Sequence, residues 1–333
     1  MRVFVTGGAG FIGSNFIRYV LESTSDVQVT NYDALTYAGN RANLAEYEED
    51  PRYTFIHGDI SDPERVADSI KDHDAIVNFA AESHVDRSIT GGTDFMLANV
   101  VGAQVLFDAA RKAEIGKFLH ISTDEVYGSI EEGSFKEGDP LEPNSPYSVS
   151  KAGADLLARA FNVTYGYPIT VTRTGNNFGP YHFPEKMIPL FTTNLIDGGT
   201  VPIYGDGSQV RDWTYVRNNA EAQWLILNEG EPGEVYNVAD DNEMTNKELT
   251  YRLLELFGLT GEEADARITH VQDRPGHDQR YSVDPTKVHA LGWKPRVAFD
   301  EALESTVAWF RDHESWWRPL KEAGATQRRG LNA

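Results

Sequence analysis

Five side chains near the middle of the chain are of the types that transfer protons. Thr123, Asp124 and Glu125 follow a mostly apolar run with the character of a buried strand, and Tyr147 and Lys151 come shortly after. Tyr147 and Lys151 are four residues apart at a predicted helix start, so they share one helix face. A free tyrosine has a pKa of about 10 and is a poor base near neutral pH. An ammonium beside it favours the phenolate, so we expect Lys151 to poise Tyr147 for proton transfer.

The two adjacent carboxylates can divide acid and base work between them. Asp124 and Glu125 are close enough to titrate as a pair, and crowding with partial burial can separate their pKa values. The ordinary interpretation is a solvated turn after a strand, because turns favour acidic residues. Tyr147 and Lys151 by themselves also match a surface tyrosine and a solvated lysine. The surrounding motifs therefore have to decide.

A glycine-rich loop directly after the first predicted strand indicates a dinucleotide site. Gly8, Gly10 and Gly13 satisfy the spacing G-x-G-x-x-G, and Gly7, Gly10 and Gly13 satisfy the variant G-x-x-G-x-x-G. Glycines let the backbone approach a pyrophosphate, whose charge then meets the N-terminus of the following helix. Asp33 ends the next strand, where a carboxylate accepts from the adenosine ribose hydroxyls and repels a 2′-phosphate, which favours NAD over NADP. A redox cofactor beside a separate acid and base indicates an oxidation that enables an elimination.

The pattern of the chain predicts the scaffold that positions these groups. Short apolar runs alternate with amphipathic stretches, which is typical of an α/β fold with a Rossmann-type doubly wound parallel sheet. Ligands of such a sheet gather outside the carboxyl ends of its strands. The expected strands are residues 2–6, 27–32, 53–57, 75–79, 117–122, 168–174 and 234–238, and the expected helices are residues 11–23, 62–71, 99–113 and 152–165. Asp59, after the third of these strands, could lie beside the adenine or cap the next helix, for which Asp62 is a second candidate.

The two halves of the chain differ in composition. Glycine, proline and aromatic residues become frequent from about residue 176. We expect an NAD-binding domain over residues 1–175 with a return segment near 212–240, and a smaller, loop-rich C-terminal substrate domain over 176–320. Residues 323–333 are expected to form a disordered tail.

Charge and composition exclude several functions. The chain has 333 residues, 51 acidic against 30 basic side chains and a formal net charge of −21, which argues against nucleic acid as a partner. No cysteine is present, so disulfides, thiolate metal sites and a cysteine nucleophile are excluded, and no metal is expected. No apolar run of about 18 residues indicates a membrane span, and the N-terminus has the pattern of a strand rather than a signal peptide, so a cytoplasmic enzyme is expected. Salt-adapted proteins have a similarly acidic surface, although an ordinary acidic cytosolic enzyme would also match.

Several short segments carry a family resemblance. They are residues 33–40, 80–88, 122–128, 176–181, 183–186, 209–213 and 273–278. In these segments the chain resembles the extended short-chain dehydrogenase/reductases that act on nucleotide sugars, and within them the dTDP-glucose 4,6-dehydratase family. The resemblance runs from Val5 to about Trp309 and is more specific than the fold-level motifs.

The resemblance implies a reaction cycle without net oxidation. Hydride passes from C4 of the hexose to NAD while Tyr147 takes the proton of the C4 hydroxyl, whose oxygen Thr123 hydrogen-bonds. The 4-ketone acidifies C5, Glu125 removes the C5 proton, and protonated Asp124 donates to the departing C6 hydroxyl. Hydride then returns to C6 and C5 is reprotonated, which gives the 4-keto-6-deoxy sugar. Lys151 would hold the nicotinamide ribose.

By the same resemblance, two sets of residues would bind the ligands. The cofactor set is Gly7, Gly10, Phe11, Ile12, Gly13, Asp33, Leu35, Thr36, Asp59, Ile60, Phe79, Ala80, Ala81, Ser83, Asn99, Tyr147, Lys151 and Asn177. The set for the nucleotide-diphosphate sugar is Ser83, Thr123, Asn176, Lys186, Pro202, Tyr204, Arg211, Asn242, Arg274 and His277. Arginine suits phosphate because its planar fork binds bidentately, although Arg211 could instead pair with Asp212. The neighbourhood of Asn242 departs from the family pattern, as do Gly175 and Phe178.

Other activities share parts of this pattern. A nucleotide-sugar 4-epimerase would use Tyr147 and Lys151 but has no need of Asp124 and Glu125 together. A GDP-mannose dehydratase or a UDP-glucuronate decarboxylase would tend to have serine or threonine at position 124. A catalytically silent NAD-binding regulator would need none of these groups. The pattern therefore favours dTDP-glucose dehydration, while the preference between dTDP and UDP stays open because the two bases differ by one methyl group.

Two of the expected helices could form a subunit interface. Residues 99–113 and 152–165 are rich in small and apolar side chains. In the resembled family the equivalent helices pack as an intersubunit four-helix bundle, so we expect a homodimer. The alternative is that these helices only cover the sheet.

Overall fold

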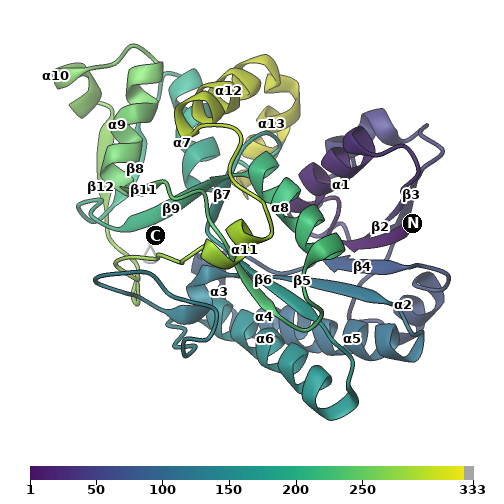
Figure 1. The fold of residues 1–333 in the computed structure, drawn as a ribbon. Coiled ribbons are helices and arrows are strands. Elements are labelled where there is room, and N and C mark those ends of the chain that lie inside the picture. Colours follow the sequence, from purple (N-terminus) through teal and green to yellow (C-terminus); the bar gives the residue numbers. More distant parts are fainter. Residues whose placement is uncertain (326–333) are drawn as a thin grey trace.

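A seven-stranded parallel β-sheet forms the centre of the molecule in a computed structural model that describes residues 1–325 (Figure 1). The strand order is β10-β6-β5-β4-β1-β2-β3, which is a doubly wound Rossmann arrangement and confirms the predicted fold class. The strands are β1 (Arg2–Thr6), β2 (Gln28–Asp33), β3 (Tyr53–His57), β4 (Ala75–Asn78), β5 (Lys117–Thr123), β6 (Thr170–Thr174) and β10 (Val235–Val238). Because all seven are parallel, Thr6, Asp33 and Thr123 meet at one edge of the sheet.

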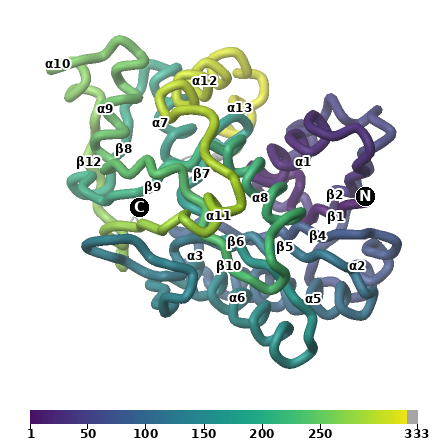
Figure 2. Tube along the Cα trace, in the orientation of Figure 1, coloured from purple at the N-terminus to yellow at the C-terminus, as the bar shows by residue number. Residues whose placement is uncertain are grey.

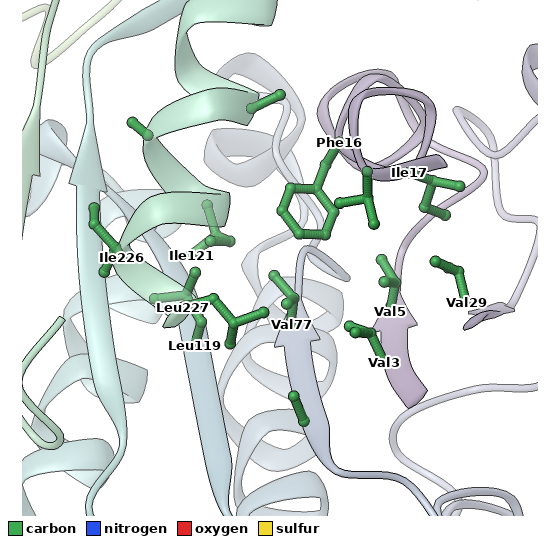
Figure 3. Close-up of a cluster of buried hydrophobic side chains, with 14 of the residues drawn as sticks. Val3, Val5, Phe16, Ile17, Val29, Val77, Leu119, Ile121, Ile226 and Leu227 are labelled. Atoms are coloured by element: carbon green, nitrogen blue, oxygen red, sulfur yellow. The ribbon is translucent and has the colours of Figure 1, made fainter. Parts of the chain in front are cut away.

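Two helices, α1 (Phe11–Ser23) and α8 (Val216–Glu229), cover one face of this sheet (Figure 3). Phe16 of α1 and Leu227 of α8 pack against Val5 and other strand side chains in a fully buried cluster. Strands β1 and β4, at the centre of the sheet, are buried and mostly apolar, which is why they read as nearly continuous apolar runs in the sequence.

Three helices cover the opposite face: α2 (Pro63–Ser69), α5 (Gly102–Lys112) and α6 (Pro146–Tyr165). Phe107 of α5 meets Phe118 and Phe161 edge to face, with ring centroids 5.1 and 5.6 Å apart. These contacts fix α6, and with it Tyr147 and Lys151, relative to β5.

The chain leaves the sheet after β6, returns with β10 beside β6, and then leaves it again, and the segments before and after β10 build a second layer of structure (Figure 2). The added strands are β7 (Asn176–Phe178), β8 (Val201–Tyr204), β9 (Val210–Tyr215), β11 (Glu243–Thr245) and β12 (Ile268–Val271), paired in the orders β11-β9-β7 and β12-β8. The added helices are α7 (Met187–Ile196), α9 (Asn246–Leu256), α10 (Gly261–Asp265), α12 (Phe299–Asp312) and α13 (Glu314–Leu320). A separate apolar core around Phe191, Trp213 and Leu253 joins these elements except α13, which packs against α12. This region therefore carries helices that the sequence did not lead us to expect.

The helix boundaries differ most from the sequence-based expectations at two places. Helix α6 begins at Pro146 rather than at residue 152, because Ser145 and Ser148 form a capping box and proline is favoured in the first turn. The helix expected at 99–113 starts earlier, with a π-helical segment, η2 (Met96–Val101), that runs into α5. The first residues of the expected tail belong to a helical turn, η4 (Lys321–Ala325), and the rest of that tail lies outside the described residues.

Candidate active site

The glycine-rich loop turns tightly between β1 and α1 and lines a cavity. Gly7 has a φ of 69°, and a Cβ atom there would lie 2.5 Å from the backbone nitrogen of Ala80, so only glycine fits. Gly7, Gly10 and Gly13 all contribute to the cavity wall, and they form the spacing G-x-x-G-x-x-G. Within the described chain no side chain caps α1 at Gly10, so the amides of its first turn stay available for an anion.

Asp33 lies at the carboxyl end of β2, and its side chain connects the glycine loop to the loop that follows β2. Its carboxylate accepts from the backbone amide of Ala9 at 2.9 Å and from that of Leu35 at 2.8 Å. Burial raises the pKa of Asp33, and the two backbone donors oppose this rise. Leu35 has a positive φ of 51°, and its backbone amide makes the bond to Asp33. Its side chain does not line the cavity, so Leu35 contributes through its backbone.

Asp59 and Asp62 have separate positions after β3. Asp62 caps α2, because its side chain accepts hydrogen bonds from the backbone of Glu64 and Arg65. Asp59 accepts from the backbone and from the hydroxyl of Ser61, each at 2.8 Å, and it lines the cavity. The helix cap is therefore Asp62, and the position of Asp59 is compatible with an adenine contact.

The carboxylate pair begins a short 3-10 turn, η3 (Asp124–Tyr127), directly after β5. Thr123 organises this turn, because its hydroxyl accepts from the backbone of Glu125 at 3.3 Å and donates to Asp124 Oδ1 at 3.2 Å. Asp124 is only 3% exposed, and its Oδ2 atom has no hydrogen-bond partner among residues 1–325. The solvated-turn interpretation of this pair is therefore wrong for Asp124.

The surroundings separate the two carboxylates electrostatically. The pKa of Asp124 is raised to about 7, mainly by burial and then by the charge of Glu125, while Arg211 lowers it. Burial also raises the pKa of Glu125, but three cations, Arg274, Arg211 and Lys186, oppose this rise. The carboxylate form is thus better stabilised at Glu125 than at Asp124.

Tyr147 and Lys151 lie in the first turns of α6 and face the same cavity. Burial, followed by the charge of Glu125, raises the pKa of Tyr147 well above its ordinary value, while a hydrogen bond with Thr123 lowers it. Lys151 donates from Nζ to the carbonyl of Ile121 at 2.6 Å, and burial lowers its pKa to about 8. The expectation that Lys151 would favour the phenolate of Tyr147 is not met here, since burial and Glu125 dominate.

A second end of the cavity is cationic. Arg211 donates to the carbonyls of Val210 and Asp278, at 2.6 and 2.9 Å, and its guanidinium lies 4.1 Å from the ring centre of Tyr281. Arg211 therefore binds these carbonyl groups rather than forming the ion pair with Asp212 that the sequence left open. Lys186 donates from Nζ to the backbone carbonyl of Ser83 at 2.9 Å.

Asp86 joins two further members of the expected substrate set. Its carboxylate accepts from the hydroxyl of Tyr204 at 2.8 Å and from Arg274 at 3.2 Å. Nearby, His277 is hydrogen-bonded to Asp273 at 2.6 Å. The charges of this end are held in fixed positions before any ligand arrives.

One cavity of about 410 Å³, within the usual range for ligand pockets, brings most of the expected residues together. They are Gly7, Gly10, Phe11, Ile12, Gly13, Asp33, Thr36, Asp59, Ile60, Phe79, Ala80, Ala81, Ser83, Thr123, Asp124, Glu125, Tyr147, Lys151, Asn176, Asn177, Lys186, Tyr204, Arg211, Arg274 and His277. Leu35, Asn99, Pro202 and Asn242 do not line it. Asn99 instead bonds both backbone groups of Glu82 and the hydroxyl of Ser150, and Asn242 bonds the carbonyl of Trp213 at 3.3 Å.

Several lining residues were not expected from the sequence. Tyr37, Glu82, His182, Glu185 and Tyr281 all contribute to the cavity wall. Tyr37 and Glu185 lie in two of the segments that carry the family resemblance, so the sequence did contain an indication of both residues. Their side chains had no assigned task because the partners that hold them lie far away in the sequence.

The fold and the cavity define an extended short-chain dehydrogenase/reductase: a Rossmann sheet, a glycine loop, and a tyrosine and lysine beside it. Residues 4–306 match the family described as GDP-mannose 4,6 dehydratase. The dTDP-glucose 4,6-dehydratase of Streptomyces niveus is 51% identical, over 96% of this chain and 96% of that protein. The low-salt glycan biosynthesis protein Agl12 of Haloferax volcanii is 54% identical, over 93% of this chain and 98% of that protein.

A solved structure is similar to the chain over almost its whole length. DesIV, a dTDP-glucose 4,6-dehydratase from Streptomyces venezuelae crystallised with NAD and TYD bound, matches with a TM-score of 0.93 and 51% identity, over 96% of this chain and all of that one. The chain belongs to the GDP-mannose 4,6-dehydratase family and, within it, to the dTDP-glucose 4,6-dehydratases. In the part of the chain that the structure describes, no group of side chains could hold a metal ion and no helix could cross a membrane.

Proposed function

We propose that this protein dehydrates dTDP-glucose to dTDP-4-keto-6-deoxyglucose with NAD as its resident cofactor. The observation that carries the proposal is the placement of two unlike carboxylates, Asp124 and Glu125, in the same cavity as Tyr147 and the glycine loop. An epimerase has no use for such a pair. A silent regulator would not need a buried acid whose pKa lies near neutrality.

The residues present fit a dinucleotide. Gly7 leaves no room for a side chain, the first turn of α1 offers free amides, and Asp33 stands at the end of β2. The glycine loop and α1 would hold the pyrophosphate, Asp33 the adenosine ribose and Lys151 the nicotinamide ribose. NAD, when bound, accepts hydride from C4 of the sugar and returns it to C6. The NAD-binding part then comprises residues 1–175 and the return segment, and the sugar-binding part residues 176–320.

Tyr147 and Thr123 act at C4 in the proposed cycle. The two side chains lie close together in the cavity wall, so one substrate oxygen can contact both. Tyr147 removes the C4 hydroxyl proton as hydride leaves, and Thr123 keeps the C4 oxygen in place. Lys151 lies on the same helix face, but its Nζ is directed to the carbonyl of Ile121, so its part in the cycle is to hold the nicotinamide ribose.

Asp124 and Glu125 carry out the elimination. Glu125 is the base at C5, because Arg274, Arg211 and Lys186 stabilise its ionised form. Asp124 is the acid at the C6 hydroxyl, because burial and the neighbouring charge keep it protonated up to neutral pH. The proton of Asp124 leaves with water, and the proton on Glu125 remains for return to C5.

The cationic end of the cavity receives the nucleotide diphosphate. Arg211, Arg274 and Lys186 provide the positive charge, and His277 lies beside Arg274. Tyr204 offers an aromatic face for the base. In a chain with a net charge of −21, this local excess of cations is what makes a dianionic ligand acceptable.

The proposed function is tested by comparing products from dTDP-, UDP- and CDP-glucose and GDP-mannose under identical conditions. We expect a 4-keto-6-deoxy sugar from dTDP-glucose with the highest kcat/KM, and a smaller difference from UDP-glucose than from GDP-mannose. Formation of dTDP-galactose would indicate an epimerase instead. Absence of any product from all four would favour an NAD-binding regulator.

The pH profile should report the protonation of Asp124. Its folded-state pKa of about 7 lies above the ordinary value, so the protonated acid dominates below neutrality and is lost as the pH rises. We therefore expect kcat/KM to fall as pH increases through about 7, with a further loss near 8 as Lys151 loses its charge. Steady-state kinetics across neutral pH measure this, with binding of dTDP alone as the control. A kcat/KM that rises through pH 7 would contradict the acid role.

We also propose that two copies of the chain associate through η2 and α6, as expected for a homodimer working in the cytoplasm. All seven large apolar side chains that are exposed in the described part lie on these two segments: Met96, Leu97, Val101, Val149, Leu156, Val163 and Tyr165. Val149, Leu156 and Val163 recur every seven residues, which places them in one stripe along α6. Such a patch marks an interaction surface. The apolar side chains of α5 face the sheet instead.

Replacing both Leu156 and Val163 with glutamate should turn the dimer into a monomer at micromolar concentration. These side chains are 59% and 71% exposed in one copy, so the substitutions disturb little in the monomer, whereas buried like charges would oppose each other across the interface. Gel filtration with light scattering in low and high salt measures the change. Ser305→Glu, on the exposed side of α12, is the control for added charge. A variant that stays dimeric would place the interface elsewhere.

A further inference from the structure

Arg173 is a buried cation that has no task in the proposed cycle. It stands one residue before the end of β6, and in the sheet it pairs with Ser122 of β5, close to the turn η3 that carries the two carboxylates. The residue is only 5% exposed, and it does not line the cavity. A fully buried arginine is rare unless it is paired, so its partners indicate what it does.

One partner of Arg173 is on the helix that carries the tyrosine and the lysine. The Nε atom of Arg173 donates to Oδ2 of Asp155 on α6 at 2.8 Å, and both side chains of this ion pair are buried. Asp155 follows Lys151 by four residues, so the two side chains share one face of the helix. Burial lowers the pKa of Lys151, and the charge of Asp155 opposes this decrease. The second oxygen of Asp155, Oδ1, is buried and has no hydrogen-bond partner among residues 1–325, so the ion pair with Arg173 holds this carboxylate.

The other partner of Arg173 is on the turn that carries the acid and the base. The Nη1 atom of Arg173 donates at 2.7 Å to the hydroxyl of Tyr127, the last residue of η3, and the guanidinium lies 4.7 Å from the centre of the tyrosine ring. Burial raises the pKa of Tyr127 to about 12, so the hydroxyl keeps its proton and donates to Oδ1 of Asn237 on β10 at 2.8 Å. The turn is therefore attached to β6 and β10 two residues after Glu125.

One guanidinium thus joins the two elements whose side chains must meet the same sugar. In the proposed cycle, Tyr147 on α6 acts at C4 and Glu125 on η3 acts at C5, and these two carbons are bonded to each other. We propose that Arg173 is a positioning residue that sets η3 and α6 relative to each other, through Tyr127 on one side and Asp155 on the other. Neither Arg173 nor these two partners line the cavity, so they act through other residues. This inference rests on the proposed function.

The two partners predict effects on different steps. Tyr127→Phe removes the hydroxyl on the η3 side, so C4 oxidation should stay close to the wild-type rate. Loss of water should slow by about tenfold to a hundredfold, because a misplacement of about 1 Å can cost about a hundredfold. Reduced nicotinamide should then build up on the protein. Asp155→Asn removes the charge beside Lys151, so C4 oxidation itself should slow, without such a build-up. Rapid mixing with absorbance detection separates the two steps, and KM for dTDP-glucose should stay nearly constant in both variants.

Arg173→Lys tests the arginine itself. Lysine keeps a positive charge beside Asp155, but its single nitrogen cannot occupy the positions of both Nε and Nη1. The variant should therefore behave as Tyr127→Phe does, with slow loss of water and a build-up of reduced nicotinamide. Keeping a cation in this site avoids an unpaired buried carboxylate. Asp300→Asn, which breaks an exposed ion pair with Arg252, is the matched control and should change none of these rates.

Release of NAD gives a readout that does not need turnover. At pH 8 the purified holoprotein of Asp155→Asn should release NAD about tenfold faster than the wild type, because a lower pKa of Lys151 leaves less ammonium to hold the nicotinamide ribose. His120 on β5 also lies near Lys151, but burial lowers its pKa well below the ordinary value and keeps it neutral. Tyr127→Phe should release NAD at the wild-type rate. Chromatography of the free nucleotide measures the release.

Other results would remove the positioning role. Equal slowing of both steps in Tyr127→Phe and Asp155→Asn, or wild-type rates with only a lower unfolding temperature, would overturn the inference and leave Arg173 with a stabilising role. Unchanged release of NAD from Asp155→Asn would contradict the α6 side of the inference. If the wild type formed no product from dTDP-glucose, the proposed function would fail, and the release of NAD would still decide whether Asp155 acts on Lys151.

Discussion

Replacing Glu125 with glutamine is expected to leave C4 oxidation intact and to stop the reaction before water is lost. The amide cannot take the C5 proton, while Tyr147, Thr123 and Lys151 are untouched. General base catalysis is worth about a hundredfold to ten-thousandfold, so dehydration should slow by at least that factor. The oxidised sugar and the absorbance of reduced nicotinamide should then accumulate on the protein. Rapid mixing with absorbance detection, followed by mass spectrometry of the quenched sugar, measures both.

Asp124→Asn provides the matched comparison within the pair. This variant keeps the base and loses the acid, so C5 should still exchange its hydrogen with solvent deuterium although water is not eliminated. Glu125→Gln should show neither exchange nor elimination. If Glu125→Gln exchanged C5 at the wild-type rate, the base would have to be another group, and the division of roles between the two carboxylates would be reversed or wrong.

Tyr147→Phe is expected to block the step before the one that Glu125 controls. Phenylalanine keeps the edge-to-face packing against Phe95, at a ring distance of 6.3 Å, but removes the hydroxyl beside Thr123. Oxidation at C4 should slow by about a hundredfold to ten-thousandfold, with no build-up of reduced nicotinamide. Supplied with a 4-keto sugar nucleotide, the variant should still exchange the C5 hydrogen, since Glu125 is intact.

Controls separate this effect from general damage to the fold. Tyr251→Phe removes a hydroxyl that bonds Asp265, remote from the cavity, and should leave kcat unchanged. Thermal unfolding of Tyr147→Phe should stay close to that of the wild type. Normal C4 oxidation in Tyr147→Phe would show that another group takes the hydroxyl proton, and would remove Tyr147 from the proposed cycle.

The central residues could be found from the sequence because each depends on short-range pattern. Thr123, Asp124 and Glu125 end a strand that reads as apolar, and the parallel sheet then places that end beside the glycine loop. Tyr147 and Lys151 are separated by about one helical turn. Their positions therefore follow once the strand and helix are recognised.

The electrostatics of the site could not be read in the same way. The pattern suggested that Lys151 would stabilise a phenolate at Tyr147, but its ammonium is directed to the carbonyl of Ile121. Burial and Glu125 set the pKa of Tyr147 instead. These pKa shifts depend on how deeply each side chain is buried and on which charges lie near it in the fold. The spacing of a sequence motif specifies neither.

The contacts of Glu185 could not be predicted from the sequence either, because its partners are distant along the chain. Its ion pair with Arg87 spans 98 residues, and its contact with Tyr37 reaches further still. The helices after residue 176 were missed for a related reason, since α7, α9 and α12 share one core that no single segment of sequence reveals. Packing between distant segments decided these features.

The glycine loop and the carboxylate pair line the same cavity, so electrons taken from the sugar can be returned to it before the product leaves. A protein built in this way consumes no oxidant. Respiration or fermentation would not have to regenerate its nicotinamide, and no partner dehydrogenase would have to follow it. Its throughput in a living cell should therefore be insensitive to the balance between oxidised and reduced nicotinamide, and should track only the supply of the activated sugar.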